Sequence, residues 1–328
     1  MIDLESLTLT EMIQLQTQLG ETLKRRFEKR LCLAFSDVVG STPYFARFGD
    51  AAGRGMQQRH FDLLRQVLPE GGGRIVDTAG DGAFTVFPGV EGAAGSFIEL
   101  ENLISAQNAT YAREHQLVIR VGLHFGPALT DGNAVNGDSV NFAARVATSC
   151  AAGEIRLSKL AFRELSTDKR LRCRGMPAVE LKGIAEPQEL MLLEWRDRTR
   201  FPSRVRIEET GEEIALPAQD TITFGRLRDH NGVSANDVVL VLPDPEQARQ
   251  VSRWQFELRR RTEGFVVRSV TDQVTEVDGA PLVKGQEMPL PPQARLLVAK
   301  VMTLQFLTES PPKPVDASGS ATFYKTKG

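Results

Sequence analysis

Two aspartates stand at the ends of apolar, strand-like runs, and each has glycine close by. Asp37 ends the run LCLAFSDV, shortly before Gly40, and Asp81 lies between Gly80 and Gly82, where the runs GRIVDT and GAFTVF meet. Glycines allow a bulky ligand to approach the backbone. Two carboxylates projected from neighbouring strand ends can bridge two Mg²⁺ or Mn²⁺ ions, which prefer oxygen ligands. Such ions activate an attacking oxygen and neutralise the charge of a triphosphate.

The turn that follows Asp37 offers a second kind of ligand. Gly40, Ser41 and Thr42 can present backbone N–H groups and hydroxyls to phosphate oxygens. Each aspartate also has a purely structural interpretation, because Asp37 can cap the next helix and Asp81 can occupy an Asp-Gly turn. These residues by themselves leave both interpretations open.

The elements that would position these residues follow from apolar periodicity. Residues 1–30 form a predicted helical leader, in which Thr8 and Glu11 have capping-box spacing. This leader either packs on its own domain or pairs two copies of the chain. Over 31–195 strands alternate with helices, which predicts an α+β sandwich built on one sheet. The predicted strands are 31–38, 73–78, 82–87, 117–126, 154–158, 177–183 and 190–195, and the predicted helices are 44–68, 91–115 and 139–150.

The pattern changes after residue 195. Residues 196–204 are polar and basic and contain a proline, which is typical of a linker. Residues 205–308 hold short alternating strands without a helical period, which predicts an all-β sandwich. Residues 309–328 are rich in proline, serine, glycine and lysine, a composition typical of a disordered tail.

Composition narrows the classes of protein. The 328 residues suit two domains, and a formal net charge of −2 argues against nucleic acid or an anionic membrane as partner. No apolar run approaches the roughly 20 residues of a membrane span, and no signal peptide is visible. The three cysteines form no CxxC pair, which favours a reduced, cytoplasmic setting.

Five motifs in order resemble the class III adenylate/guanylate cyclases over residues 30–195. They are F-S-D-V-V-G-S-T at 35–42, G-D-G at 80–82, R-V-G-L-H-F-G at 120–126, G-D-S-V-N-F-A-A-R at 137–145 and L-K-G-I-A-E-P at 181–187. The resemblance implies a ferredoxin-like α/β sandwich that converts a nucleoside triphosphate into a 3′,5′-cyclic nucleotide and pyrophosphate. It also implies a head-to-tail homodimer with active sites at the subunit interface.

The resemblance further implies a role for individual residues. Asp37 and Asp81 would bind both metal ions in one subunit, and Asn141 and Arg145 would come from the other. Asn141 would orient the ribose, and Arg145 would stabilise charge on the α-phosphate. These two residues are four apart on a predicted helix and so share a face. Lys182 falls in the family's phosphate-binding lysine region.

Base selection departs from the adenylate cyclase pattern. Asp77 and Ala134 stand where adenylate cyclases carry a lysine and an Asp or Thr. Guanine presents two donors that a carboxylate satisfies, whereas adenine presents an acceptor that a lysine satisfies. GTP is therefore the favoured substrate and ATP the next. Because Asp is shorter than the Glu typical of guanylate cyclases, a pyrimidine base or a bridging water stays an alternative.

Residues 205–308 resemble a forkhead-associated domain, a family that binds phosphothreonine peptides. The motifs are G-R at 225–226, N-D-V-V-L at 236–240, S-R-W-Q at 252–255 and V-D-G at 277–279. The resemblance implies that Arg226 and Ser252 contact phosphate and that Arg253 supports their loop. Gln255 replaces the family's bracing histidine. The ligand would be a phosphothreonine protein or the chain's own tail, with its threonines at 322 and 326.

Two functions from different classes follow. In the first, an active cyclase is regulated or localised through its forkhead-associated domain. In the second, a catalytically weak cyclase fold is a dimeric scaffold for phosphopeptide binding. The presence of Asp37, Asp81, Asn141 and Arg145 together favours the active enzyme, because a decayed one would lose metal ligands as readily as base-reading residues.

Overall fold

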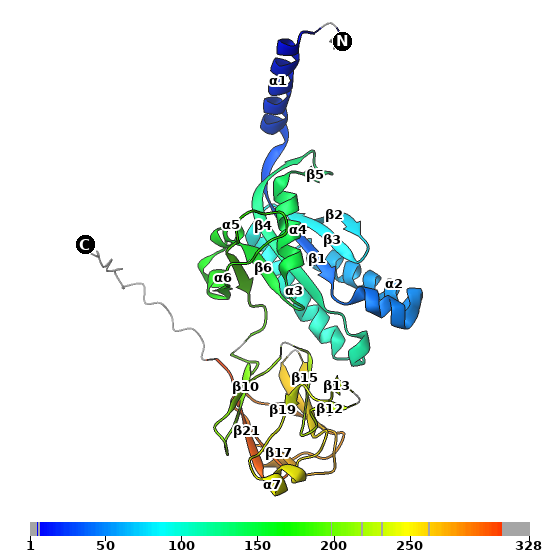
Figure 1. The fold of residues 1–328 in the computed structure, drawn as a ribbon, viewed down its shortest axis with the longest axis vertical. Coiled ribbons are helices and arrows are strands. Elements are labelled where there is room, and N and C mark those ends of the chain that lie inside the picture. Colours follow the sequence, from blue (N-terminus) through cyan, green and yellow to red (C-terminus); the bar gives the residue numbers. More distant parts are fainter. Residues whose placement is uncertain are drawn as a thin grey trace, which may run out of the picture. The chain divides into compact units, whose positions relative to one another are not determined.

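The computed structural model describes residues 5, 7–197, 199–217, 219–230, 232–261 and 263–309. These residues divide into two compact units (Figure 1), the first of which ends at Arg196 and also takes in Arg260 and Arg261. The second unit begins at Asp197, inside the range predicted as linker, and Phe201 already belongs to its core.

The first unit is built on one mixed sheet with the strand order β2-β3-β1-β4-β6-β8-β7, and the short β5 pairs with β4. All neighbours are antiparallel except β4 and β6. The central β1 therefore lies between β3 and β4. The strands are β1 (Glu28–Val38), β2 (Arg74–Ala79), β3 (Gly82–Phe87), β4 (Ile119–Thr130), β5 (Val135–Asn136), β6 (Ile155–Ser158), β7 (Cys173–Gly175) and β8 (Leu190–Leu193).

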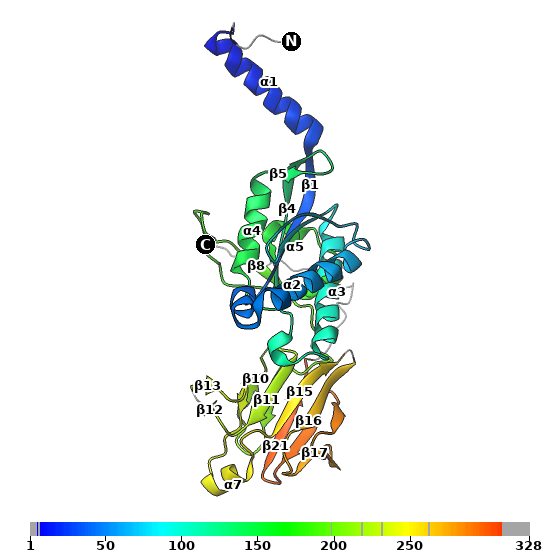
Figure 2. The same ribbon diagram turned by 90° about the vertical axis from the view of Figure 1, so that its right-hand side faces the viewer.

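Helices cover both faces of this sheet (Figure 2). Helices α2 (Ser41–Val67) and α3 (Val90–Asn108) pack on one face, and α4 (Asp138–Ser149) packs on the other. Along β1, Cys32 and Ala34 belong to the core under α2 and α3, whereas Leu33 belongs to the core under α4. This is the two-residue alternation of a strand buried on both sides. The short helices of this unit are η1 (Arg113–His115), α5 (Lys159–Arg163) and α6 (Thr167–Leu171).

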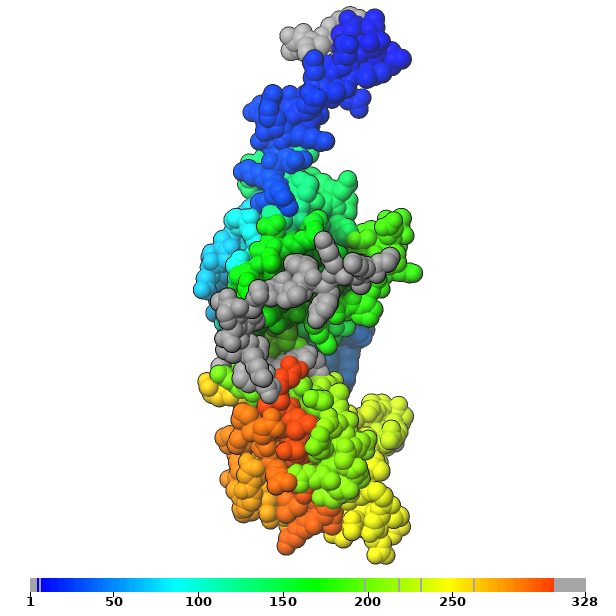
Figure 3. Space-filling view, turned by 90° about the vertical axis from the view of Figure 1, so that its left-hand side faces the viewer, coloured from blue at the N-terminus to red at the C-terminus, as the bar shows by residue number. Residues whose placement is uncertain are grey.

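Helix α1 (Leu9–Phe27) lies within the range 1–30 predicted as a helical leader, whereas residues 28–30 of that range already belong to β1. Thr8 and Glu11 form the expected capping box at the start of α1. None of its residues is buried, and Figure 3 shows its dark blue surface standing clear of the rest of the first unit. One strand prediction is wrong, because residues 177–183 form only an isolated bridge between Val179 and Gln188.

The second unit consists mainly of two sheets around a shared apolar core, with strand orders β10-β9-β21-β20-β17-β18 and β14-β11-β15-β16-β19. A short helix, α7 (Pro245–Gln250), corrects the expectation of strands alone. The strands are β9 (Arg204–Ile207), β10 (Glu213–Ala215), β11 (Thr221–Gly225), β12 (Asp229–His230), β13 (Val233–Ser234), β14 (Val238–Val239), β15 (Phe256–Arg261), β16 (Gly264–Ser269), β17 (Thr275–Val277), β18 (Ala280–Pro281), β19 (Glu287–Leu290), β20 (Arg295–Val298) and β21 (Met302–Leu307).

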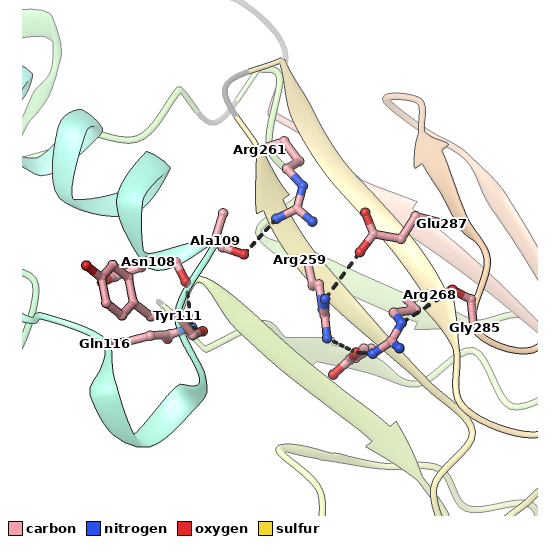
Figure 4. Close-up of polar contacts among 10 residues, drawn as sticks. Asn108, Ala109, Tyr111, Gln116, Arg259, Arg261, Arg268, Gly285 and Glu287 are labelled. Atoms are coloured by element: carbon pink, nitrogen blue, oxygen red, sulfur yellow. Dashed lines mark hydrogen bonds and ion pairs between the residues drawn. The ribbon is translucent and has the colours of Figure 1, made fainter.

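Ion pairs join three neighbouring strands of the second unit. Arg259 of β15 pairs with Glu287 of β19 at 3.3 Å and with Glu257 at 2.6 Å. Arg268 of β16 pairs with the same Glu257 at 3.0 Å. Figure 4 shows Arg259, Arg268 and Glu287 on this surface. Partly exposed pairs of this kind contribute about 1 kcal/mol or less each, so they reinforce the strand register rather than determine it.

Among the residues that the structure describes, no helix combines the length and apolar character needed to cross a bilayer. The three cysteines are free thiols. Cys32 lies in the main core of the first unit, where it packs as a small apolar residue.

Candidate active site

A pocket of about 800 Å³ lies in the first unit, between the sheet and helix α4. It brings together Asp37 of β1, Asp77 of β2, Arg120 of β4 and Ala134 of the loop before α4. The predicted metal ligand Asp37 and the two predicted base-reading positions therefore share one cavity. Its lining residues are Phe35, Ser36, Asp37, Val76, Asp77, Ala79, Gly82, Ala83, Phe84, Arg120, Asn133, Ala134, Val135, Asn136, Val140, Ala144, Ala147 and Thr148.

The register of β1 and β3 brings Asp37 next to the turn that carries Asp81. Ser36 pairs with Ala83 in this antiparallel ladder, so Asp37 lies beside Gly82. A Cβ built on Gly82 would lie 3.6 Å from Asp37 Oδ1. Gly80 has φ 60°, a left-handed conformation that favours glycine in the tight β2–β3 turn. Asp37 and the turn that carries Asp81 thus lie at the same end of the neighbouring strands β1 and β3.

Asp81 does not itself line the pocket, although Ala79, Gly82 and Ala83 beside it do. Its Oδ2 atom is buried and has no hydrogen-bond partner among the described residues. A buried, unpaired carboxylate oxygen is costly unless a ligand satisfies it. Among the described residues, no group of three or more His, Cys, Asp or Glu side chains could hold a metal ion. Asp37 and Asp81 would therefore offer two carboxylates. Two carboxylates suit Mg²⁺ or Mn²⁺, because Mg²⁺ is usually held by one or two carboxylates together with substrate phosphates.

Arg120 is a pocket residue whose contact the sequence did not predict. Its Nη2 and Nε atoms donate to Asp37 Oδ2 at 2.6 and 3.0 Å. Asp37 and Arg120 stand opposite each other in the β1–β4 ladder, and both side chains are about one-third exposed. The arginine therefore supplies the positive charge beside this carboxylate. This contact could not be predicted from the sequence, because it depends on the register in which β1 pairs with β4.

His60 is a second functional candidate that the sequence did not predict. It is fully buried on α2, and its ring nitrogens lie 3.1 Å from Ser36 Oγ and 3.0 Å from the carbonyl oxygen of Asp81. Burial lowers the pKa of His60 to about 4, so the imidazole is neutral at neutral pH.

The turn after Asp37 begins helix α2. Gly40 is the N-cap residue with φ 74°, no side chain caps the helix, and the first turn contains no acidic residue. The N–H groups of Ser41 and Thr42 therefore lie at an uncapped helix N-terminus, which favours anions such as phosphate. None of these three residues lines the pocket, although their helix starts four residues beyond Asp37.

Asn141 and Arg145 lie on the exposed side of α4. Val140 and Ala144 of the same helix line the pocket, whereas Asn141 and Arg145 do not. Arg145 makes no ion pair with any residue that the structure describes. Within one copy of the chain, these two side chains therefore do not line the pocket that holds Asp37.

Two glycines of β4 determine how closely α4 packs on the sheet. A Cβ on Gly122 would lie 2.2 Å from the backbone N of Ala147, and a Cβ on Gly126 would lie 2.6 Å from Ser139 Oγ. The close packing of the α4 backbone therefore requires glycine at 122, whereas a Cβ at Gly126 would meet side-chain atoms. His124, between them, is buried and bonds Ser158 Oγ at 2.9 Å.

The loop before α4 has a defined shape. Asp131 Oδ1 accepts hydrogen bonds from the N–H groups of Asn133 and Ala134, both at 2.9 Å. This loop places Ala134 in the pocket with Asn133 beside it, and Asp77 reaches the same pocket from β2. Asp77 Oδ1 accepts from the N–H of Thr78 at 2.8 Å, which leaves Oδ2 for a ligand.

Lys182 lies apart from this pocket. It is exposed and lines a separate hollow of about 580 Å³, formed by residues 180–185 and Pro187. The structure of one copy therefore does not bring Lys182 together with Asp37.

Residues 23–194, just over half of the 328-residue chain, match the family described as the adenylate and guanylate cyclase catalytic domain. The chain belongs to this family. Members of the family generally use divalent metal ions, which agrees with the unpaired oxygen of Asp81. The cyclase domain thus spans helix α1 in part and the whole sheet of the first unit.

Individual relatives of the cyclase domain are distant. A putative adenylate cyclase 3 from Rhizobium meliloti (strain 1021) is 22% identical over 207 residues, which are 63% of this chain and 35% of the relative, so the chain spans about a third of its length. Adenylate cyclases from Trypanosoma brucei in their monomeric state are 21% identical, with a TM-score of 0.43 and coverage of 50% of this chain and 89% of theirs. The guanylate cyclase domain of RhGC from Catenaria anguillulae, in complex with GTP, is 21% identical, with a TM-score of 0.42 and coverage of 51% and 97%.

The unit that follows the cyclase domain brings its own predicted residues together. The N–H of Arg226 donates to Ser252 O at 3.0 Å, and a Cβ on Gly225 would lie 2.2 Å from Arg253 O. Arg226 and Arg253 are exposed, and Ser252 is half-buried with its hydroxyl 2.9 Å from that of Thr271. Two guanidinium-bearing residues and two hydroxyls thus meet on neighbouring loops.

Gln255 braces these loops from below. It is fully buried, its Oε1 accepts the N–H of Ser252 at 2.8 Å, and its Nε2 donates to Thr275 Oγ1 at 3.1 Å. Gln255 therefore holds the loop that carries Ser252 against the strand that carries Thr275.

Proposed function

We propose that this chain converts a nucleoside triphosphate into a 3′,5′-cyclic nucleotide and pyrophosphate, at sites shared between two copies of the chain. The observation that carries the proposal is the pocket that collects Asp37, Asp77 and Ala134 beside the turn of Asp81, in a domain of the cyclase family. The nucleophile is the 3′-hydroxyl of the substrate, so the reaction needs no nucleophile from the protein.

The residues of one copy bind and orient the reacting groups. Asp37 and Asp81 would hold two Mg²⁺ or Mn²⁺ ions, supported by the unpaired Oδ2 of Asp81. When bound, these ions activate the 3′-hydroxyl and neutralise triphosphate charge. The uncapped N–H groups of Ser41 and Thr42 would receive phosphate oxygens.

The second copy completes the site. Asn141 and Arg145 are exposed and do not line the pocket of their own copy, so we assign them to the pocket of a second copy. In a head-to-tail dimer, Asn141 would orient the ribose and Arg145 would stabilise the charge that develops on the α-phosphate. Lys182, also outside the pocket, would reach phosphate in the same assembly.

Guanine is the base that the pocket favours. Asp77 offers a carboxylate oxygen that accepts from the N1–H and exocyclic amine of guanine, and Ala134 offers no polar group that would select adenine. GTP is therefore the proposed substrate, with ATP next and a pyrimidine nucleotide as the alternative.

The test incubates the purified full chain with ATP, GTP, CTP and UTP separately, with Mn²⁺ or Mg²⁺, and identifies cyclic products by mass. Asp37→Ala and Asp81→Ala should abolish the product and leave the circular dichroism spectrum unchanged. Full activity in either variant would contradict the proposal that both carboxylates hold the metal ions. A wild-type chain that makes no cyclic product would instead favour the scaffold function.

A mixing experiment tests the shared site. Asp37→Ala and Arg145→Ala proteins are each inactive by the proposal, but a mixed dimer contains one intact site. Activity should return on mixing, to at most a quarter of the wild-type value for random pairing of equal amounts. No recovery, in a mixture shown by native mass spectrometry to contain mixed dimers, contradicts the shared site.

A second candidate function concerns the strand-rich unit, as a phosphothreonine reader that regulates or localises the cyclase. The observation that favours it is the brace of Gln255 under Ser252, which keeps the loop of Ser252 and Arg253 against Arg226. The threonines at 322 and 326, proposed as a ligand in the chain's own tail, lie outside the described residues. A tethered ligand would profit from a high effective concentration.

A peptide titration tests this reader. Full-chain protein is titrated with a phosphothreonine peptide library and with the unphosphorylated peptides, and Arg226→Ala is the matched variant. The proposal expects tighter binding of phosphorylated peptides and loss of that preference in Arg226→Ala. Equal binding of both peptide sets identifies the unit as a docking or dimer module.

A further inference from the structure

His60 contacts both elements that carry the candidate metal ligands. The residue lies on α2, is fully buried, and sits 3.1 Å from Ser36 Oγ through Nε2 and 3.0 Å from Asp81 O through Nδ1. Ser36 immediately precedes Asp37 on β1, and Asp81 forms the β2–β3 turn. A single imidazole therefore spans the two segments from the side opposite the pocket.

The two hydrogen bonds fix the tautomer of His60. A carbonyl oxygen can only accept, so Nδ1 carries the proton and donates to Asp81 O. Nε2 then has a free lone pair and accepts from the hydroxyl of Ser36. The ring thus satisfies one acceptor and one donor that are buried with it, and any apolar replacement leaves both unpaired.

The alternation of β1 links this contact to the pocket. Both Ser36 and Asp37 line the pocket, but the hydroxyl of Ser36 bonds His60 on α2, whereas the carboxylate of the next residue, Asp37, bonds Arg120. On the other segment the bond from His60 holds the backbone of Asp81, while the carboxylate oxygen Oδ2 has no partner among the described residues. The direction of that carboxylate therefore depends on the position of the backbone that His60 holds.

We propose that His60 is a positioning residue that fixes the spacing between the Asp37 and Asp81 carboxylates and thereby sets the affinity of the site for a divalent cation. It contacts neither substrate nor cation. The inference rests on the proposed function, because it takes these two aspartates as the metal ligands. Residues that orient metal ligands typically change metal affinity about 10- to 100-fold when they are replaced.

The first test measures Mn²⁺ binding to the full chain by electron paramagnetic resonance of free Mn²⁺. His60→Phe should raise the Mn²⁺ dissociation constant about 10- to 100-fold. Ser36→Ala removes one of the two bonds and should give a smaller rise. His60→Asn keeps a donor near the position of Nδ1 and should recover part of the affinity, which also covers the case in which His60→Phe does not fold.

His124 provides the matched control. It is likewise a buried histidine of this domain, 7% exposed, and bonds a serine hydroxyl, that of Ser158, at 2.9 Å. His124→Phe should lower the melting temperature and leave the Mn²⁺ dissociation constant unchanged. A rise equal to that of His60→Phe would mean that general destabilisation, and not spacing, controls the affinity.

A second readout needs no metal. Hydrogen exchange of the amides at 80–82 should be faster in His60→Phe than in wild type and unchanged in His124→Phe. If Asp81→Ala and wild type bind Mn²⁺ equally, the two-carboxylate site itself fails. If Asp81→Ala loses Mn²⁺ while His60→Phe binds it as wild type does, the metal site stands and the role of His60 is overturned.

Discussion

Gly122→Ala tests whether α4 must lie this close to the sheet for the enzyme to work. A Cβ at Gly122 would lie 2.2 Å from the backbone N of Ala147, 2.5 Å from its Cα and 2.8 Å from its Cβ, whereas ordinary contact begins at 3.4 Å. Two of these atoms are helix backbone, which cannot rotate away as a side-chain end can. The helix must therefore move by about 1 Å, and it carries Asn141 and Arg145 with it.

The expected effects differ for stability and activity. Overpacking of a tight contact costs about 1–3 kcal/mol of unfolding free energy. A misplacement of catalytic groups by about 1 Å can lower the rate about 100-fold, which corresponds to about 2.7 kcal/mol of transition-state stabilisation. We therefore expect kcat of Gly122→Ala, measured by product formation at saturating nucleotide, to fall about 100-fold. Urea denaturation should show that the domain stays folded at 25 °C.

Substitutions of two further glycines serve as comparisons for Gly122→Ala. Gly126→Ala meets Ser139 Oγ at 2.6 Å and His124 Nε2 at 2.9 Å, which are side-chain ends that can turn, so its loss should be smaller. Gly95, inside α3, has nothing within 4 Å of an added Cβ, and Gly95→Ala should stabilise the protein by about 0.5–1 kcal/mol without changing kcat. Wild-type kcat in a destabilised Gly122→Ala protein would refute the reasoning.

Two other predictions concern the base and pH. Asp77→Lys combined with Ala134→Asp should shift the nucleotide preference from GTP toward ATP by about tenfold to a hundredfold, because a lost hydrogen bond to the base costs about 1–3 kcal/mol. Competition between GTP and ATP measures this preference. Burial lowers the pKa of His124 from 6.5 to about 4, so between these values the unfolded chain binds a proton at this residue that the folded chain does not. The unfolding free energy should be full above pH 6.5, and His124 alone should account for a fall of about 3 kcal/mol as the pH drops to 4, in addition to the fall that comes from His60, whose pKa is likewise lowered to about 4. His124→Asn should keep the contribution of His60 and therefore show a weaker slope.

The sequence predicted the candidate site residues but not the contacts that support them. Motif order pointed to Asp37, Asp77 and Ala134, which the structure brings into one pocket, and helical spacing put Asn141 and Arg145 on one face. The first inference depends on the resemblance to the cyclase motifs, and the second depends on helical periodicity, which a sequence displays directly.

The supporting contacts depend on tertiary register, which a single sequence does not display. Arg120 and Asp37 are 83 positions apart and meet only because β1 pairs with β4 in one register. His60 is a lone histidine on a helix, and nothing around it announces that it spans Ser36 and Asp81. The wrongly predicted strand at 177–183 also reflects tertiary pairing. Its local apolar pattern is typical of a strand, but the segment forms only a single bridge, between Val179 and Gln188.

The charges around the pocket imply that nucleotide and metal bind cooperatively. Of the described charged residues that line it, Asp37 and Asp77 are acidic and Arg120 is basic, and the adjacent Asp81 adds a third carboxylate, so their formal charge is −2. A triphosphate brings further negative charge, and like charges in a partly desolvated pocket repel. Cations that bind Asp37 and Asp81 relieve this repulsion, and linkage makes the effect reciprocal.

Isothermal titration calorimetry measures this coupling directly. Saturating Mn²⁺ should lower the dissociation constant of a non-cyclisable nucleotide analogue at least about tenfold, or about 1.4 kcal/mol, and the analogue should raise Mn²⁺ affinity by the same factor. Asp77→Asn removes one negative charge without replacing either candidate metal ligand, so the coupling should weaken because less repulsion is left to relieve. Nucleotide affinity that does not respond to Mn²⁺, or coupling that Asp77→Asn leaves at its full wild-type value, would show that the acidic pocket does not link the two ligands.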